Sequence, residues 1–102
     1  QARLAQANGV DFGCVREAML HGSAGSRALE LFGGRMASRD FSAGVQARLH
    51  HKDMGIVLAE AARLGLAMPL SASVWQQLNA LMAQGGAMKD TSALLSVLET
   101  PA

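Results

Sequence analysis

Apolar residues recur along this chain at the three- and four-residue spacing of α-helices, and glycines interrupt the pattern at intervals. The longest periodic segment covers residues 45–64 and is followed by Gly65. Its main apolar stripe lies on one helical face and consists of Met54, Val57, Leu58 and Ala61. No segment alternates apolar and polar residues as a half-buried strand does. The pattern therefore predicts an all-α fold, a bundle of about six helices.

Five further helices are expected, each bounded by a glycine, a proline or a capping residue. The first three are residues 1–8 before Gly9, a segment capped by Asp11 that ends at Gly22, and one opened by Ser23 or Ser26 and closed by Gly33 and Gly34. The other two begin at Pro69, near the capping candidate Ser71, and at Asp90 or Thr91, with Pro101 beyond the end. Residues 35–44 show no clear period and are expected to form an ordered connection.

The composition supports one helical domain. Hydrophobic residues make up 50% of the 102 residues but aromatic residues only 4%, so Ala, Leu, Val and Met supply most of the apolar surface. This length suffices for one core and not for two, which makes residues 1–102 a single domain. The mean hydropathy of +0.18 is high for a small free-standing domain. This value indicates that part of the apolar surface of the chain is covered by other protein, either in a larger protein or in an oligomer.

Features that the sequence lacks narrow the class of protein. No apolar run approaches the roughly 18 residues that span a bilayer, and no leader pattern supports secretion. Cys14 is the only cysteine and cannot form an internal disulfide, so we expect a reducing compartment, the cytoplasm. The net charge of +1, from nine basic and eight acidic residues, argues against a general nucleic-acid binder.

Residues 35–52 are the most basic part of the chain. They include the cations Arg35, Arg39, Arg48 and Lys52 and the histidines His50 and His51, with Asp40 as the one acid. Such a stretch either receives an anionic ligand, such as a phosphate or a carboxylate, or forms a solvated loop and helix face. The sequence leaves both interpretations open.

Lys52 is the sharpest candidate within this stretch. On a helical wheel it falls near Val45, Leu49 and Ile56, opposite the main apolar stripe. A lysine among apolar neighbours is either a snorkelling side chain or a cation that faces a ligand. The residues alone do not decide between the two.

No metal site is predicted. His50 and His51 are adjacent and point about 100° apart on a helix, which prevents them from sharing an ion. Cys14 has no neighbouring histidine or cluster of cations, so we expect a buried, unreactive thiol. The six methionines are scattered and are interpreted mostly as core filler.

Residues 49–62 (LHHKDMGIVLAEAA) and 65–70 (GLAMPL) resemble a pattern of the β-hydroxyacid dehydrogenase family, at the start of the long helix of its C-terminal domain. This 6-phosphogluconate dehydrogenase-like family includes 3-hydroxyisobutyrate dehydrogenase and tartronate semialdehyde reductase. The resemblance extends in order over nearly the whole chain. The other matching segments are Gly9-Val10-Asp11, Ala24-Gly25-Ser26, Arg35-Met36, Arg39-Asp40-Phe41 and residues 90–94 (DTSAL).

The resemblance implies an enzyme that transfers hydride between NAD or NADP and a small hydroxyacid. In this family an N-terminal Rossmann domain binds the dinucleotide, and a long interdomain helix carries a catalytic lysine and an asparagine. Those positions would precede Gln1, so this chain is expected to lack the catalytic residues, the Rossmann domain and most of the interdomain helix. Lys52 matches the family lysine that reaches the cofactor, and Asp53 matches its acidic neighbour on the substrate side. Val45 stands where family members often have an aromatic residue, which leaves the identity of the acid open.

The resulting hypothesis is a C-terminal, substrate-side and dimerisation domain of a 2-hydroxy-3-oxopropionate reductase or 3-hydroxyisobutyrate dehydrogenase, inactive alone. We expect a homo-oligomer that pairs through the first helix around Leu4 and the helix carrying Trp75, Leu78 and Leu81. The alternative is a non-catalytic helical interaction module of the same fold. A third interpretation, an anion- or RNA-binding domain that uses residues 35–52, is weaker because few aromatics are available to stack on bases.

Overall fold

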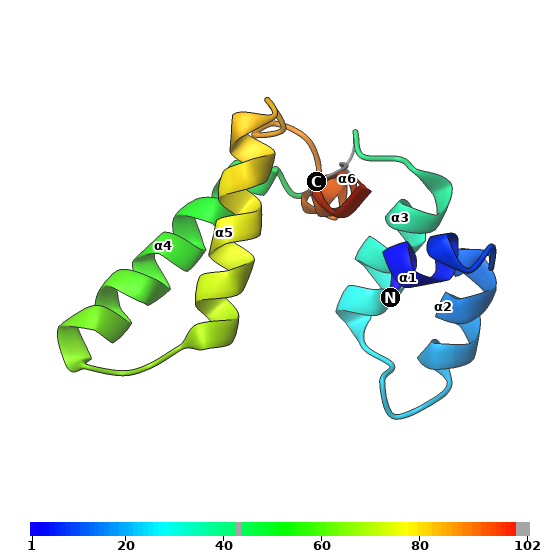
Figure 1. Cartoon of the computed structure of the whole chain (residues 1–102), viewed down its shortest axis with the longest axis horizontal. Coiled ribbons are helices and arrows are strands. Elements are labelled where there is room, and N and C mark those ends of the chain that lie inside the picture. Colours follow the sequence, from blue (N-terminus) through cyan, green and yellow to red (C-terminus); the bar gives the residue numbers. More distant parts are fainter. Residues whose placement is uncertain (43, 100–102) are drawn as a thin grey trace.

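The computed structural model describes residues 1–42 and 44–99, and within them every regular element is a helix (Figure 1). The elements are α1 (Ala2–Ala7), α2 (Phe12–Leu20), the π-helical turn η1 (Leu29–Gly33), α3 (Gly34–Ser38), α4 (Ala47–Leu64), α5 (Pro69–Ala83), the 3-10 turn η2 (Thr91–Ala93) and α6 (Leu94–Glu99). The predicted all-α fold of about six helices is confirmed. In the part of the chain that the structure describes, no helix is both long and apolar enough to cross a membrane.

Most helix ends lie where the sequence places them. Gly9 and Gly65 follow α1 and α4 with φ angles of 69° and 70°, a left-handed conformation that glycine adopts without strain. Pro69 is the first residue of α5, where its missing N–H leaves no hydrogen bond unmade. The expected cap at Ser71 is wrong, because α5 begins before this residue and has no side-chain cap.

The third helix does not end at Gly33 and Gly34, as the sequence suggested. It continues from η1 through both glycines into α3 and ends at Ser38, so residues 35–38 are helical rather than part of the connection. The two glycines lie beside Arg16, since a Cβ on either would be in van der Waals contact with the arginine side chain at 3.4 Å. Arg16 Nη2 donates a hydrogen bond to the carbonyl oxygen of Glu30 at 2.8 Å, which fixes α2 against η1.

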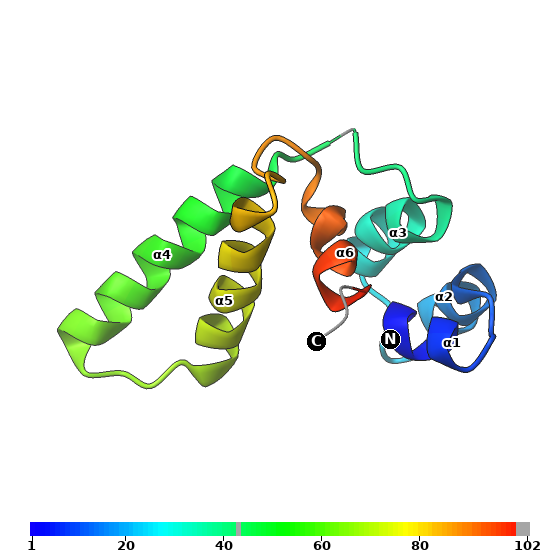
Figure 2. The ribbon, with the colours of Figure 1, turned by 45° about the horizontal axis from the view of Figure 1, so that its top comes forward.

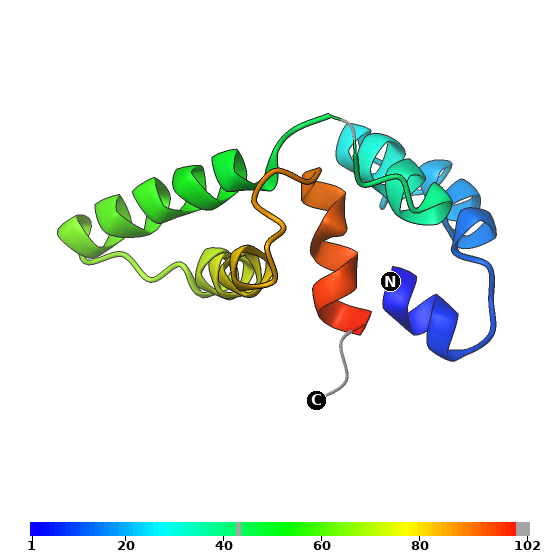
Figure 3. The same cartoon turned by 90° about the horizontal axis from the view of Figure 1, so that it is seen from above.

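The helices form two groups with α6 between them (Figure 1). One group consists of α1, α2, η1 and α3, and the other is an antiparallel hairpin of α4 and α5, as the turned views also show (Figure 2 and Figure 3). The molecule is elongated, with extents of 42 × 32 × 28 Å. The far end of the hairpin, around residues 64–70, projects away from the first group.

Within residues 1–42 and 44–99, the buried apolar residues form two small hydrophobic clusters rather than one large core. The first joins α1, α2 and α6 and consists of Ala2, Ala5, Phe12 and Leu95. The second joins α4, α5 and η2 and consists of Ala47, Leu81 and Ala93. Phe41 packs against both clusters, so the connection after α3 ties the two groups of helices together.

The residues just before α4 pair with the segment before η2. Thr91 N–H donates to the carbonyl oxygen of Val45 at 3.0 Å, and an antiparallel bridge joins Gln46 to Asp90. These contacts hold the chain extended, so α4 begins at Ala47, two residues later than the apolar pattern predicted.

Candidate functional site

Most of the chemistry that the sequence singled out lies in four consecutive residues of α4: His50, His51, Lys52 and Asp53. The face of α4 that packs against α5 includes the buried alanine Ala61, while Ala47 is buried where the helix begins. Because successive residues turn by about 100° around a helix, the four side chains point in different directions. Each therefore has surroundings of its own.

Lys52 and Asp53 project into solvent. Their side chains are 64% and 59% exposed, and Lys52 Nζ lies 3.4 Å from Asp53 Oδ1. On the helical wheel Lys52 shares an outward stripe with Arg63 and with Ile56, which is 60% exposed. The lysine thus lies where the wheel placed it, as an exposed cation beside uncovered apolar surface.

His50 contacts the segment that leads into α6. Its Nδ1 lies 2.6 Å from Thr91 Oγ1, and the threonine hydroxyl in turn donates to the carbonyl oxygen of Val45 at 3.4 Å. The ring of Phe32 meets the imidazole edge-on, with centroids 6.1 Å apart. His50 therefore joins α4 to η2 and to η1.

His51 contacts α5 instead. Its Nε2 lies 2.5 Å from Asn79 Oδ1, and its ring stacks on Trp75 with an interplanar angle of 7° and centroids 5.9 Å apart. The two histidines therefore bond to different elements. No group of three His, Cys, Asp or Glu residues that could hold a metal ion occurs in residues 1–42 and 44–99.

Trp75 is a residue of α5, and its side chain packs against α4 within the hairpin. A Cβ on Gly55 would lie 3.5 Å from Trp75 Nε1, so the indole covers this glycine of α4, and its buried N–H has no partner among the described residues. Leu78 and Leu81 are each only 1% exposed. The expectation that these two leucines form a subunit interface is therefore wrong, because α5 uses them to pack within the domain.

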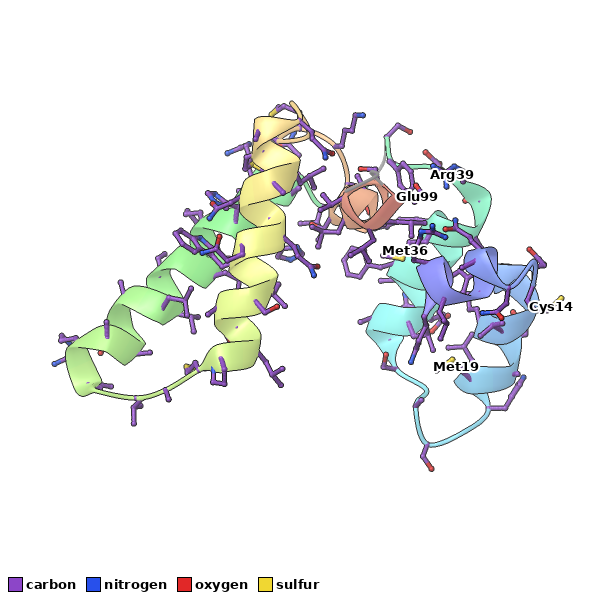
Figure 4. The ribbon with its side chains drawn as sticks, viewed as in Figure 1. Cys14, Met19, Met36, Arg39 and Glu99 are labelled. Atoms are coloured by element: carbon purple, nitrogen blue, oxygen red, sulfur yellow. The ribbon has the colours of Figure 1, made fainter. Side chains whose placement is uncertain are left out.

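The basic stretch does not converge on one ligand. Arg35 Nη1 lies 2.9 Å from the buried carboxylate of Asp90. Arg39 makes two hydrogen bonds to Glu99, at 2.8 and 3.0 Å, which join the end of α3 to α6 (Figure 4). Arg48 Nε donates to the side chain of Gln46 at 2.7 Å. Arg35 and Arg39 therefore join separate elements, whereas Arg48 and Lys52 are exposed on α4 and pair with near neighbours in the sequence.

Cys14 is exposed on α2, so the expectation of a buried thiol is wrong (Figure 4). Its Sγ lies 3.5 Å from Asp11 Oδ2, to which the thiol donates. This hydrogen bond and the nearby negative charge raise the pKa of the Cys14 thiol. A thiol with a raised pKa is a poor nucleophile, so the structure places no reactive cysteine here.

A pocket of about 180 Å³ opens beside His50 and Asp53, where α4, α5 and α6 meet. Its remaining lining residues are Met54, Val74, Leu78, Thr91 and Leu94. The surface that these residues present to the pocket is apolar. The carboxylate of Asp53 projects into solvent beside it and pairs with Lys52.

The described residues fit a contribution to a dinucleotide site rather than a complete one. A Rossmann-type site requires a strand followed by a glycine-rich turn and a helix, and no strand occurs within residues 1–42 and 44–99. Lys52 offers an exposed cation, which can contact an anionic group.

Sequence reasoning missed the partners that hold this site in place. Asp90 was expected as a helix cap, and its Oδ2 does accept from Ser92 N–H at 2.9 Å. Its other oxygen, however, accepts from Arg35, and nothing in the sequence links these two residues. Likewise, no local pattern points to Asn79 as a partner of His51.

The chain matches a family model over residues 2–98, and the family is described as NAD-binding of NADP-dependent 3-hydroxyisobutyrate dehydrogenase. It is 41% identical to 2-hydroxy-3-oxopropionate reductase from Escherichia coli (strain K12) over 85 residues, which are 83% of this chain and 29% of that protein. It is also 41% identical over 91 residues to a probable 3-hydroxyisobutyrate dehydrogenase-like 1, mitochondrial, from Arabidopsis thaliana, covering 89% of this chain and 27% of that protein.

A solved structure shares the fold. The crystal structure of 3-hydroxyisobutyrate dehydrogenase from Salmonella typhimurium superposes with a TM-score of 0.89 at 20% identity, over 93% of this chain and 33% of that one. The chain thus spans only about 29% and 27% of the two curated relatives that it matches. Because the family model covers nearly all of the described helices, this chain belongs to the NAD-binding 3-hydroxyisobutyrate dehydrogenase family.

Proposed function

We propose that this chain is the C-terminal, substrate-side and dimerisation domain of an NAD(P)-dependent oxidoreductase that acts on a small β-hydroxyacid or its semialdehyde. The reaction would be of the kind named for its relatives, 2-hydroxy-3-oxopropionate reductase and 3-hydroxyisobutyrate dehydrogenase. Another part of the full-length protein would supply the dinucleotide-binding domain and the general acid. The chain would therefore be inactive alone.

The position of Lys52 is the observation that carries this proposal. The lysine is exposed on the longest helix of the domain, within the segment that the family model matches. Beside it Ile56 leaves apolar surface uncovered. An exposed cation next to an exposed apolar residue suits a face that a second domain closes over an anionic ligand.

Each residue of the site has a distinct role in this proposal. Lys52 would place a positive charge beside the dinucleotide, whose nicotinamide ring exchanges hydride with the substrate when bound. Asp53 would accept a hydrogen bond from a substrate hydroxyl, because an ionised carboxylate can only accept. Val45, which is 37% exposed just before α4, would leave more room for the acid than an aromatic residue does.

Self-association is part of the same proposal. The accessible surface of 6349 Å² exceeds the roughly 5,500 Å² expected for a compact monomer of 10.6 kDa. Much of the uncovered apolar area lies on the hairpin tip, where Leu66 and Leu70 are 59% and 83% exposed, and Leu4 of α1 is 68% exposed. Leu4 therefore stays in the surface through which we expect two copies to pair, and Leu66 and Leu70 replace Leu78 and Leu81 in it.

The test compares Lys52→Ala with Arg63→Ala in the full-length protein. The two residues share a stripe of α4, and each pairs with a nearby acid, so they differ mainly in position along the helix. Lys52→Ala should weaken NAD(P)H binding about 10- to 100-fold, as expected for a charge-assisted contact of about 1.5–3 kcal/mol, and leave thermal stability nearly unchanged. Arg63→Ala should change neither. Equal, small effects of both substitutions would contradict the role of Lys52.

The alternative function is a non-catalytic interaction module of the same fold. The full-length sequence distinguishes this module from the enzyme. The enzyme requires a glycine-rich Rossmann unit and a lysine general acid in the full-length protein. A full-length sequence that keeps the helical domain but lacks that lysine would favour the module.

A further inference from the structure

We propose that His50 and His51 are positioning residues: together they fix the rotation of α4 about its axis and thereby the direction of Lys52 and Asp53. The inference rests on the proposed function, because it assigns to the histidines the task of aiming those two side chains at cofactor and substrate. Neither histidine needs to touch a ligand for this role.

Lys52 and Asp53 have little to hold them in place themselves. Both are well exposed, and among the described residues their ion pair is with each other. A contact between neighbours in one helix moves with the helix and does not orient it. The direction of both side chains is therefore set by the backbone of α4.

The apolar packing of α4 specifies its rotation poorly. Its buried residues are the alanines Ala47 and Ala61, which present small, smooth surfaces to the neighbouring elements. Apolar contacts are also not directional, so a small rotation of the helix costs them little. Hydrogen bonds weaken steeply when they are misaligned, and they are the contacts that can resist rotation.

His51 provides one such contact, to α5. Because the Asn79 side-chain oxygen can only accept, Nε2 of His51 carries the proton in their 2.5 Å hydrogen bond. The stacked indole of Trp75 restricts the imidazole plane at the same time. Rotation of α4 in either direction would break the hydrogen bond or unstack the rings.

His50 provides the second contact, about 100° further round the helix. Its Nδ1 donates to Thr91 Oγ1, and the threonine hydroxyl donates onward to the carbonyl oxygen of Val45. This chain of bonds fixes the start of α4 to η2, an element different from the one that His51 binds. Two anchors to two neighbours define a rotation, which one anchor cannot do.

A small rotation of α4 would move the ends of its side chains by a functionally important distance. A side chain ends roughly 6 Å from a helix axis, so a rotation of about 20° moves its end by roughly 2 Å. Catalytic groups lose about 100-fold in rate when they are misplaced by about 1 Å. Lys52 and Asp53 directly follow the two histidines, so their placement depends on the turn that the anchors hold.

The activity test uses the full-length protein and a mutant cycle. His50→Ala combined with His51→Ala should lower kcat/KM about 10- to 100-fold. In a background that already carries Lys52→Ala and Asp53→Ala, the same histidine changes should add almost nothing, because there is no side chain left to aim. His50→Asn with His51→Gln keeps nitrogen donors near the positions of Nδ1 and Nε2 and should restore most of the activity. His21→Ala, at an exposed histidine outside α4, is the control and should be silent.

A second readout does not depend on activity. Spin labels at Lys52→Cys and Arg27→Cys, in a Cys14→Ser background and diluted with unlabelled protein, report the direction of residue 52 relative to the first group of helices. The His50→Ala/His51→Ala pair should shift or broaden this distance distribution by a few ångströms, and His50→Asn/His51→Gln should restore it. An unchanged distribution overturns the positioning role, and so does an equal loss of kcat/KM in the Lys52→Ala/Asp53→Ala background. A shifted distribution with unchanged kcat/KM supports the anchors and instead overturns the proposed function of Lys52 and Asp53.

Discussion

Arg35 and Asp90 lie 55 residues apart in the chain and form an ion pair with a fully buried carboxylate. The Asp90 side chain is 0% exposed and that of Arg35 25%, and Nη1 lies 2.9 Å from Oδ1. The same oxygen accepts from the backbone N–H of Val45 at 3.0 Å. The pair therefore links α3, the start of α4 and η2, and it joins the two groups of helices where they meet.

Asp90→Ala should destabilise the domain by about 3 kcal/mol or more, because it leaves the Arg35 guanidinium partly buried without its partner. Chemical unfolding monitored by circular dichroism measures the loss. Asp40→Ala is the matched control, since Asp40 is exposed and its carboxylate accepts hydrogen bonds from the nearby Ser42. A similar loss from both changes would contradict the central place of the ion pair.

Gly44→Ala should also be strongly destabilising. Gly44 has a φ of 92°, and a Cβ there would overlap the guanidinium of Arg35. Strain of this kind plus the displaced ion pair should cost about 2–4 kcal/mol in the free energy of unfolding. Gly9→Ala has a similar φ of 69° but nothing within 4 Å of the added Cβ, so it should cost only about 1–2 kcal/mol. A larger loss of stability from Gly9→Ala than from Gly44→Ala would contradict this role of Gly44.

Glu99 should make stability depend on pH in the acid range. Its hydrogen bonds from Arg39 lower the pKa of this carboxyl, and Gln6 adds a further hydrogen bond at 2.8 Å. A lowered folded pKa means that the stabilisation is fully present above the ordinary glutamate pKa of about 4.3 and is lost as pH falls through the folded value. Glu99→Gln should therefore cost up to about 1 kcal/mol at pH 7 and nothing at pH values below the folded pKa. A gap between the two proteins that stays constant with pH would refute this assignment.

The general fold could be predicted from the sequence because its determinants are local. Helical periodicity, a proline at the start of α5 and glycines with positive φ at Gly9 and Gly65 are properties of short segments. Gly33 and Gly34 were expected to end a helix, yet the helix continues through both. A glycine that ends a helix and a glycine within one look alike in a single sequence.

Only part of the site could be predicted, because some of its features are local to α4 and others depend on residues far apart in the sequence. The exposure of Lys52 follows from its place on the wheel of α4. The partners of His50 and His51 lie 41 and 28 residues away, and only the packed hairpin brings them together. Contacts of that range leave no local pattern in one sequence.

Self-association should be visible by sedimentation at micromolar concentration. Two-fold pairing would cover the apolar hairpin tip, so Leu70→Ser should weaken the dimer without unfolding it, because Leu70 is 83% exposed. Trp75→Ala should act differently and lower stability, since it removes the stack on His51. A clean monomer of the unmodified protein at this concentration would count against pairing through this domain.

The most direct measurement is the initial rate of NADH and NADPH oxidation with 2-hydroxy-3-oxopropionate as substrate. The full-length protein should oxidise one of the two cofactors, while residues 1–102 alone should give no rate above background, because the chain lacks a strand-based dinucleotide site within its described residues. Lys52→Ala in the full-length protein should lower the rate at limiting cofactor. Turnover by the isolated chain, or a full-length protein that oxidises neither cofactor with any small hydroxyacid semialdehyde, would contradict the account.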